Sequence, residues 1–336
     1  MMRGMSSLRI FFHAAIMAVA VAVAVALACQ PAAAQPRPAE CLIPSKPGGG
    51  MDLTCKLAQK ALHDQPGAPD LALSYLPGGV GAVAWHTIVS QRRAEANTLV
   101  TFSGGSVLNL ALGKFGDAEV RDVRWVAAFG ADYGMVAVRA DSPWRTLDDL
   151  LNALKRDPKK VLIGMSGTVG SQDWIKMALL AQMAGIDPRK MRFVALEGGG
   201  EQFIAMQENH VQAVSGDTSE ALLYTGGGKV RVLAVLSEQR LPGALANVRT
   251  AREQGYDVVW PVIRGVWMGP DVREADYRRW VRAFANMESN PEFAAKRAQA
   301  GLYPFSLTGD ALTRYIERSV AGHHRQARQF KLLRER

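Results

Sequence analysis

The sequence Pro47-Gly48-Gly49-Gly50 lies between the strand-like run Cys41-Leu42-Ile43-Pro44 and the helical run Leu53–His63. A second stretch, Pro77-Gly78-Gly79-Val80-Gly81, follows the apolar run Leu71–Leu76 and precedes another helical run. A glycine-rich turn from a strand into a helix directs backbone N–H groups and the positive end of the helix dipole toward one point. Two such turns in successive strand–helix units predict that the chain binds a small anion.

The first loop contains two kinds of candidate besides its glycines. Lys46 adds a positive charge, and Asp52 falls in the first helical turn, where a carboxylate meets the positive end of the dipole. A single Pro-Gly-Gly would be read as a flexible turn, whereas the repetition favours ligand binding. The candidate ligand contacts of the two loops are Lys46, Gly49, Gly50, Asp52, Gly79, Val80 and Gly81.

Further glycine- and serine-rich junctions follow later strand-like runs, at residues 103–106, 166–171, 197–200 and 215–219. Ligands of open α/β sheets bind at the carboxyl ends of the strands, where all these junctions are expected to lie. Each serine taken alone is better explained as a helix cap than as a ligand contact, and the cluster of junctions is more informative than any one of them. The candidates from these junctions are Ser103, Ser166, Ser171 and Asp217.

Arg264 is a separate candidate, because an arginine near a domain crossing can bind a carboxylate through two parallel hydrogen bonds. A surface ion pair explains it equally well.

Short β-like runs alternate with amphipathic helices, which predicts an α/β fold with mainly parallel sheets. The expected strands are 41–44, 71–76, 98–102, 125–129, 135–139, 161–165, 191–195, 213–215, 230–236 and 266–268. After the last of them we expect three helices, 274–287, 291–300 and 309–329, and no further strand. Pattern breaks at 140–144 and 255–261 predict two hinged lobes. Residues 36–140 and 258–336 would form lobe 1, and residues 141–257 lobe 2.

The first 35 residues have the pattern of a secretory signal peptide. Arg3 and Arg9 precede an apolar stretch, and Ala32-Ala33-Ala34 is a small-residue cleavage site, so cleavage is expected near Ala34. Two alternatives are a retained membrane anchor and a lipid attached to Cys29. The rest of the chain has 38 basic and 31 acidic residues, a formal charge of +7 that suits an acidic ligand or an anionic surface.

Cys41 and Cys55 form an even pair in an exported chain, which predicts a disulfide across the first glycine loop. No cysteine or histidine has metal-ligand spacing, and we expect neither metal nor cofactor.

A catalytic role has little support in the sequence. No phosphate-binding GxxxxGK[ST] motif occurs. The run from Gly164 resembles the nucleophile elbow GxSxG around Ser166, but position 168 is threonine where the motif requires glycine. A secreted hydrolase using Ser166 is the alternative function, but it needs a histidine base. The histidines that follow the leader lie on predicted helices or tails, at His63, His86, His210, His323 and His324.

The chain resembles the periplasmic solute receptors of tripartite tricarboxylate transporters, the TctC or Bug (Bordetella uptake gene) group. The resemblance rests on the order and spacing of the 44–50 loop, the 77–81 loop, the segment 197–217, the run 233–237 and the run 264–270. The common family pattern has Pro-Phe-Pro-Pro-Gly-Gly in the first loop and no cysteine. The Pro-Ser-Lys-Pro-Gly-Gly-Gly sequence and the Cys41/Cys55 pair are more similar to the tricarboxylate-binding branch.

This resemblance implies a type II periplasmic binding fold with a Venus-flytrap cleft and no enzymatic activity. It implies a carboxylate held by the first two glycine loops, with Ser166, Ser171 and Asp217 opposite, and delivery to integral membrane transporter subunits. Citrate is the first candidate, with isocitrate, tricarballylate and smaller acids left open. Signalling to a membrane sensor kinase is a third possibility, and no nucleic-acid partner is expected.

Overall fold

The computed structural model describes residues 39–65 and 68–332, which belong to one compact unit, Pro38–Arg336. The expected signal peptide, with its cleavage site near Ala34 and Cys29, lies outside the described residues, so those interpretations stay predictions. In the described part of the chain, no helix is long and apolar enough to cross a membrane.

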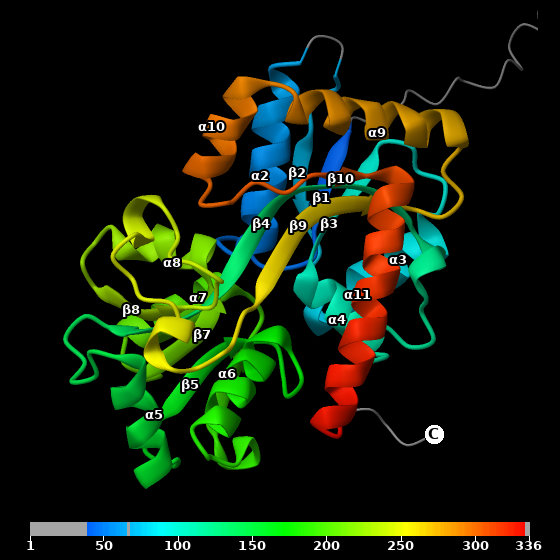
Figure 1. Ribbon diagram of the computed structural model, residues 1–336. Helices are drawn as coiled ribbons and strands as arrows, with labels where there is room; N and C mark the ends of the chain where they lie inside the picture. The colour runs from blue at the N-terminus through cyan, green and yellow to red at the C-terminus, as the bar shows by residue number, and fades with distance from the viewer. Residues whose placement is uncertain (1–38, 66–67, 333–336) are drawn as a thin grey trace, which may run out of the picture. The chain divides into compact units, whose positions relative to one another are not determined.

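Strands and helices alternate through most of the described chain, as expected (Figure 1). The strands are β1 (Glu40–Ile43), β2 (Ala72–Tyr75), β3 (Thr98–Ser103), β4 (Arg124–Arg139), β5 (Leu162–Ser166), β6 (Arg192–Leu196), β7 (Ala213–Asp217), β8 (Val230–Val235), β9 (Pro261–Met268) and β10 (Leu307–Thr308). The α-helices are α2 (Gly50–His63), α3 (Ala82–Gln91), α4 (Gly104–Ala111), α5 (Leu147–Arg156), α6 (Gln172–Met183), α7 (Gly199–Gln207), α8 (Thr218–Thr225), α9 (Glu274–Glu288), α10 (Pro291–Gln299) and α11 (Gly309–Gln329).

The strands form one sheet in the order β2-β1-β3-β9-β4-β7-β5-β6, and β8 and β10 also pair with β4. β1 runs parallel to β2 and β3, and β5 runs parallel to β6 and β7. Every pairing of β4 and β9 is antiparallel. The α/β class is therefore confirmed, but the expectation of mainly parallel sheets is wrong. The sheet is mixed because β4 and β9 run antiparallel to the neighbouring strands β3, β7 and β8, which are each connected to the chain through helices.

β4 was expected as two strands, 125–129 and 135–139, but it is a single strand of 16 residues. Its partner changes within the segment between those two ranges: Tyr133 pairs with Pro261 of β9, and Gly134 pairs with Asp217 of β7. The polar Asp132 interrupts the apolar pattern, yet its side chain is fully buried. The strand β10 shows that the expectation of no further strand is wrong. With two residues, β10 is too short to show a periodicity in the sequence, which is why it was not predicted.

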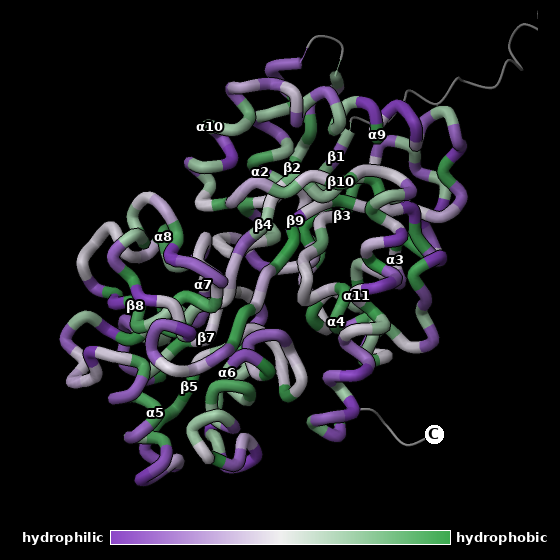
Figure 2. Tube along the Cα trace, viewed as in Figure 1, coloured by the Kyte–Doolittle hydropathy of each residue, from purple (hydrophilic) through white to green (hydrophobic). Residues whose placement is uncertain are grey.

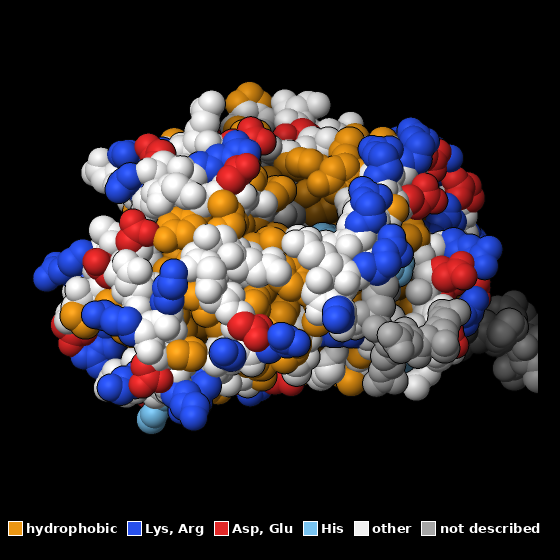
Figure 3. Space-filling model, turned by 60° about the horizontal axis from the view of Figure 1, so that its bottom comes forward, with side chains coloured by type: hydrophobic (Ala, Val, Ile, Leu, Met, Phe, Trp, Pro, Cys, Tyr) orange, Lys and Arg blue, Asp and Glu red, His pale blue; other side chains and the backbone are white. Residues whose placement is uncertain are grey.

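Hydrophobic residues concentrate along the strands and on the inner faces of the helices (Figure 2). In α5 the buried residues Leu147, Leu150, Leu151 and Leu154 form one stripe, and the Thr146 hydroxyl caps the helix by accepting from the Asp149 N–H. On the face in Figure 3, basic and acidic side chains are interspersed, and hydrophobic side chains line a hollow.

The predicted disulfide is present between Cys41 in β1 and Cys55 in α2. Both cysteines are fully buried. The bond therefore fixes α2, which begins at the first glycine loop, to the first strand of the sheet.

Candidate functional site

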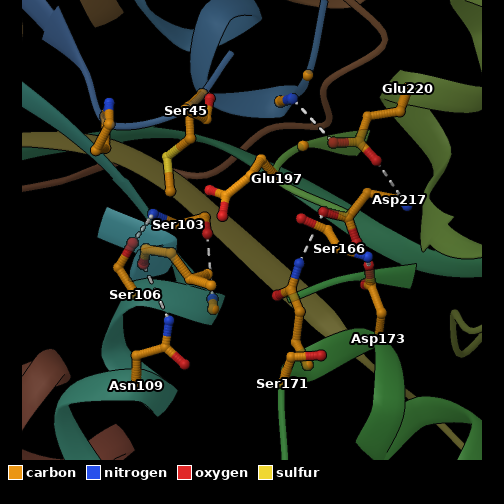
Figure 4. A pocket seen from close by; sticks show the side chains of 18 of the residues that line it. Ser45, Ser103, Ser106, Asn109, Ser166, Ser171, Asp173, Glu197, Asp217 and Glu220 are labelled. Atoms are coloured by element: carbon orange, nitrogen blue, oxygen red, sulfur yellow. Dashed lines mark hydrogen bonds between the residues drawn. The ribbon is translucent and has the colours of Figure 1, made fainter. Parts of the chain in front are cut away.

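Within the described chain, five helices begin at one pocket (Figure 4). Their N-cap residues all line it, and each lies at or just beyond the carboxyl end of a strand: Gly49, Ser103, Ser171, Gly198 and Asp217. The helices are α2, α4, α6, α7 and α8. The space open to the centres of water molecules is about 70 Å³, and a single water occupies roughly 10–15 Å³ on the same measure. The pocket therefore suits a ligand of a few atoms' width.

The helix ends give the pocket a positive contribution that does not depend on basic side chains. Ser103 accepts a hydrogen bond from the Gly105 N–H at 3.2 Å, and Ser171 accepts one from the Trp174 N–H at 3.3 Å. Gly49 and Gly198 have no side chain with which to cap α2 and α7. Ser103 and Ser171 therefore act as helix caps at this pocket, whereas Gly49 and Gly198 add no side-chain cap to the helices that follow them.

A buried ionic cluster forms the floor of the pocket. The Arg264 Nη2 donates to Asp132 Oδ2 at 2.8 Å and to Asp217 Oδ2 at 2.7 Å. The Lys176 Nζ lies 2.9 Å from Asp217 Oδ1 and 2.7 Å from Asp173 Oδ1. All five side chains are at most 3% exposed. Asp217 thus joins β9 to α6 through two cations, and neither side of the cluster can lose a partner without leaving a buried charge unpaired.

Burial and neighbouring charges shift the pKa values of this cluster in opposite directions. Burial alone would raise the pKa of Asp217, but Lys176 and Arg264 outweigh it and hold that pKa below its usual value. Burial raises the pKa of Asp173 to about 6 despite the attraction of Lys176. Burial, with Asp217 nearby, raises the pKa of Glu220 to about 8. The pocket wall therefore includes a carboxyl whose pKa is raised well above its usual value.

Glu220 occupies one of the backbone donors expected for the ligand. The Gly50 N–H donates to Glu220 Oε1 at 2.9 Å, so this first-loop donor is already engaged by α8. A Cβ placed on Gly50 would lie 2.2 Å from Arg264 Nη1 and 2.3 Å from Arg264 Cζ. The first loop therefore requires glycine at position 50, because Arg264 packs directly against its backbone.

Eight of the predicted ligand contacts line the pocket, and four do not. The eight are Gly49, Gly50, Val80, Ser103, Ser166, Ser171, Asp217 and Arg264. The other four are Lys46, Asp52, Gly79 and Gly81. Arg264 is 2% exposed, which excludes the alternative interpretation of a surface ion pair.

Lys46 and Asp52 have other partners in the structure. The Lys46 Nζ lies 2.5 Å from Glu201 Oε1, at an exposed position. Asp52 is buried and accepts from the Gly48 N–H at 2.8 Å and from the Tyr75 hydroxyl at 2.9 Å. Asp52 thus holds the first loop in shape from the first turn of α2. Direct ligand contact by either residue stays a prediction.

The second loop carries a strained residue. Val80 has φ 53° and ψ 42°, a left-handed conformation that β-branched residues rarely adopt. Its carbonyl accepts a hydrogen bond from Asn109 Nδ2 at 3.3 Å. α4 therefore holds Val80 at the pocket wall in a backbone conformation that the residue would not adopt alone.

The sequence interpretation missed several residues of the pocket. Asn109, Gln172, Asp173, Glu197 and Glu220 line it, and Lys176 lies behind it. One signal was readable: Asp217 and Glu220 have capping-box spacing, and the structure shows that box. Lys176 gave no signal, because a lysine within an otherwise apolar helix is normally read as solvent-exposed.

Among the described residues, Ser166 has no histidine as a catalytic partner. Of the described residues, no histidine lines the pocket, and His323 instead lies against Trp260. The Ser166 N–H donates to Asp173 Oδ2 at 2.8 Å, which is a loop contact. Across the described residues, no group of three or more His, Cys, Asp or Glu side chains is arranged to hold a metal ion.

The sequence pattern of one family, described as "Tripartite tricarboxylate transporter family receptor" (TctC), matches residues 79–331. The chain belongs to this family. Members of the TctC family are solute-binding receptors, and the chain has the α/β fold of periplasmic binding proteins.

Individual relatives are distant from this TctC chain. A UPF0065 protein of Bordetella pertussis is 21% identical over 282 residues, covering 84% of this chain and 85% of the relative. MatC of Rhodopseudomonas palustris, solved with bound malate, has a TM-score of 0.74 at 17% identity and covers 86% of this chain and 98% of its own. Rpa4515 of R. palustris, solved with adipate, has a TM-score of 0.76 at 18% identity and covers 87% and 96%. These structures support the shared fold.

Proposed function

We propose that this TctC receptor binds a small di- or tricarboxylate in the pocket where five helices begin, and delivers it to the membrane subunits of a tripartite transporter. Citrate remains the first candidate from the sequence. We place the protein in the periplasm, exported by its N-terminal segment. The observation that carries the proposal is the convergence of the N-caps Gly49, Ser103, Ser171, Gly198 and Asp217 on one pocket.

A carboxylate fits the donors that remain on the pocket wall. Arg264 Nη2 is engaged by Asp132 and Asp217, but the buried Arg264 Nε has no acceptor among the described residues. An unpaired buried donor is costly, and a carboxylate is a strong acceptor for a guanidinium. The two R. palustris relatives were solved with malate and adipate, each of which has two carboxyl groups.

Capture by closure of two lobes is part of the proposal, with lobe 1 at 36–140 and 258–336 and lobe 2 at 141–257. Several polar contacts join these two sets of residues around the pocket. Lys46 pairs with Glu201, and the Lys114 Nζ donates to Thr168 Oγ1 at 3.3 Å and to the Val169 carbonyl at 3.2 Å. In the proposal, these contacts would break on opening and re-form around the ligand.

Isothermal titration of the purified protein tests the proposed function. The protein is first unfolded and refolded to remove carried-over ligand, and is then titrated with citrate, isocitrate, tricarballylate, malate, succinate and adipate. One-to-one binding of at least one acid, weakened in Gly50→Ala, is the expected result. Binding of dicarboxylates alone would exclude the citrate assignment, and binding of none would refute the receptor function.

A further inference from the structure

Several hydrogen-bond acceptors on the pocket wall have no partner among the described residues. Asn109 is 3% exposed, and its Nδ2 donates to the Val80 carbonyl at 3.3 Å. Its Oδ1 is buried and has no donor among the described residues. The hydrogen bond to the Val80 carbonyl identifies the amide atom on that side as the nitrogen. The atom on the opposite side of the amide is therefore the oxygen.

Gln172 repeats this arrangement at the start of α6. Its Nε2 donates to Asp217 Oδ2 at 3.1 Å, and its Oε1 is buried without a partner in the described chain. A Cβ on Gly105 would lie 3.0 Å from this Oε1, so the oxygen lies close to the N-terminus of α4. Two amide side chains from different helices are thus each oriented by one N–H hydrogen bond, and the oxygen of each is left without a partner.

Glu197 adds a third and charged acceptor. It is exposed, it lines the pocket, and Figure 4 shows it projecting among the pocket serines. In the described chain, its carboxylate has no hydrogen bond and no ion pair. The nearby cation Lys46 pairs with Glu201 instead, at 2.5 Å. The Glu197 carboxylate is therefore available to a donor on the ligand.

Among the described residues, no donor of the pocket is hydrogen-bonded to Asn109 Oδ1 or Gln172 Oε1. Of the described residues, Arg264 is the one cationic side chain on the wall, and its Nη2 is shared by Asp132 and Asp217. A ligand that offers only carboxylates would pair with the helix N-termini and Arg264 and would leave these acceptors without a donor. A ligand with a hydroxyl or ammonium group would supply the missing donor.

We propose that the receptor selects carboxylates that also carry a hydrogen-bond donor, a hydroxyl or an ammonium group, and that Glu197 receives this donor, with Asn109 and Gln172 as further acceptors of the same pocket. The inference rests on the proposed function, since it assigns the second half of the same ligand. The carboxylate end lies at the helix N-termini and Arg264, and the donor end lies at Glu197. Selectivity then depends on the donor rather than on the number of carboxylates.

Matched pairs of acids that differ mainly in the donor test this inference by titration calorimetry. The pairs are malate and succinate, citrate and tricarballylate, and aspartate and succinate. We expect the donor-bearing member of at least one pair to bind about tenfold more tightly or better, because its absence leaves buried acceptors unpaired. Deoxy acids that bind as tightly as their partners would overturn the inference while leaving the proposed function intact. If no acid binds, both fall.

Variants of Glu197 test whether this residue receives the ligand's donor, and they distinguish a hydroxyl from an ammonium group. Glu197→Ala removes the acceptor, so the two acids of the preferred pair should then bind with nearly equal affinity, a ratio of dissociation constants near one. Glu197→Gln keeps an acceptor but removes the charge, so it should preserve a preference for a hydroxyl and abolish one for an ammonium group. Glu208→Gln, at an exposed position near the end of α7, is the matched control and should keep the wild-type ratio. A ratio that Glu197→Ala leaves unchanged, or an equal loss of affinity for both members of a pair, would refute the role of Glu197.

Discussion

Replacing Gly50 by alanine tests the contact on which the floor of the pocket depends. The new Cβ would lie 2.2 Å from Arg264 Nη1 and 2.3 Å from its Cζ and Nη2. Gly50 is the first residue of α2 and does not have a positive φ. Alanine can therefore adopt the same backbone conformation, and any effect must come from the clash with the guanidinium.

The loss of stability expected for Gly50→Ala depends on how firmly the Arg264 side chain is held in place. Its side chain is 3% exposed and is tied to Asp132 and Asp217, so it cannot move aside freely. Overpacking of a well-packed interior typically costs about 1–3 kcal/mol. Expelling the guanidinium would leave two carboxylates buried without that partner, and breaking a buried ion pair costs roughly 3–5 kcal/mol. We therefore expect Gly50→Ala to lower the free energy of unfolding by about 3 kcal/mol.

Urea unfolding followed by far-UV circular dichroism measures this loss as a lower midpoint with an unchanged slope. Gly226→Ala is the matched control, since Gly226 has φ −59° and ψ −21° and a Cβ there would meet no atom within 4 Å. The control should unfold at the wild-type midpoint or slightly above it, because alanine restricts the unfolded chain. Titration of both variants with the acid that binds wild type should show weaker binding for Gly50→Ala alone.

One result would refute the reasoning. If Gly50→Ala unfolds at the same urea concentration as Gly226→Ala and binds the acid as wild type does, Arg264 does not pack against Gly50. The account of the pocket floor would then be wrong. A loss of stability with unchanged binding would instead separate the ionic cluster from the ligand site.

Two further predictions concern pH and the disulfide. The pKa of Glu220, raised from 4.5 to about 8 in the folded protein, means that the folded state binds more protons than the unfolded state across that interval. Stability should fall as pH rises from about 5 to 8, and urea midpoints measured at pH 5, 6.5 and 8 should show a flatter trend in Glu220→Gln; an equal trend in both proteins would contradict the assignment. Reduction of Cys41–Cys55, which closes a loop with a sequence separation of 14, should lower the free energy of unfolding by about 3 kcal/mol, and an unchanged midpoint with dithiothreitol would contradict this.

The location of the pocket was predictable because it depends on local chain geometry. A strand followed by a glycine- or serine-rich turn and a helix brings the helix N-terminus to the carboxyl end of the strand, whatever the remaining topology. The loops at 47–50, 103–106, 166–171, 197–200 and 215–219 all meet at the pocket for this reason. The same local reasoning placed Asp52 in the first turn of α2, where the structure shows it.

The ionic floor was not predictable, because its partners are far apart in the chain. Asp132 and Arg264 meet because β4 pairs with β9, and Asp217 joins them because β4 also pairs with β7. A single sequence does not specify that strand order. Asp132 lies in the gap left between the expected strands 125–129 and 135–139, because the partners that make its burial favourable come from distant segments of the chain.

Helix capping explains part of why an anion site contains so many carboxyl groups. Asp217 is the N-cap of α8, and Glu220 follows in its first turn, so both acids stabilise a helix end that faces the pocket. Each helix end contributes about half a positive charge; Lys176 and Arg264 neutralise Asp173 and Asp217, and Glu197 offsets part of the remaining charge. A pocket balanced in this way gains little from further negative charge on its ligand. Its selectivity must then come from where the ligand places its hydrogen-bond donors, and the unpaired oxygens of Asn109, Gln172 and Glu197 are where those donors would be received.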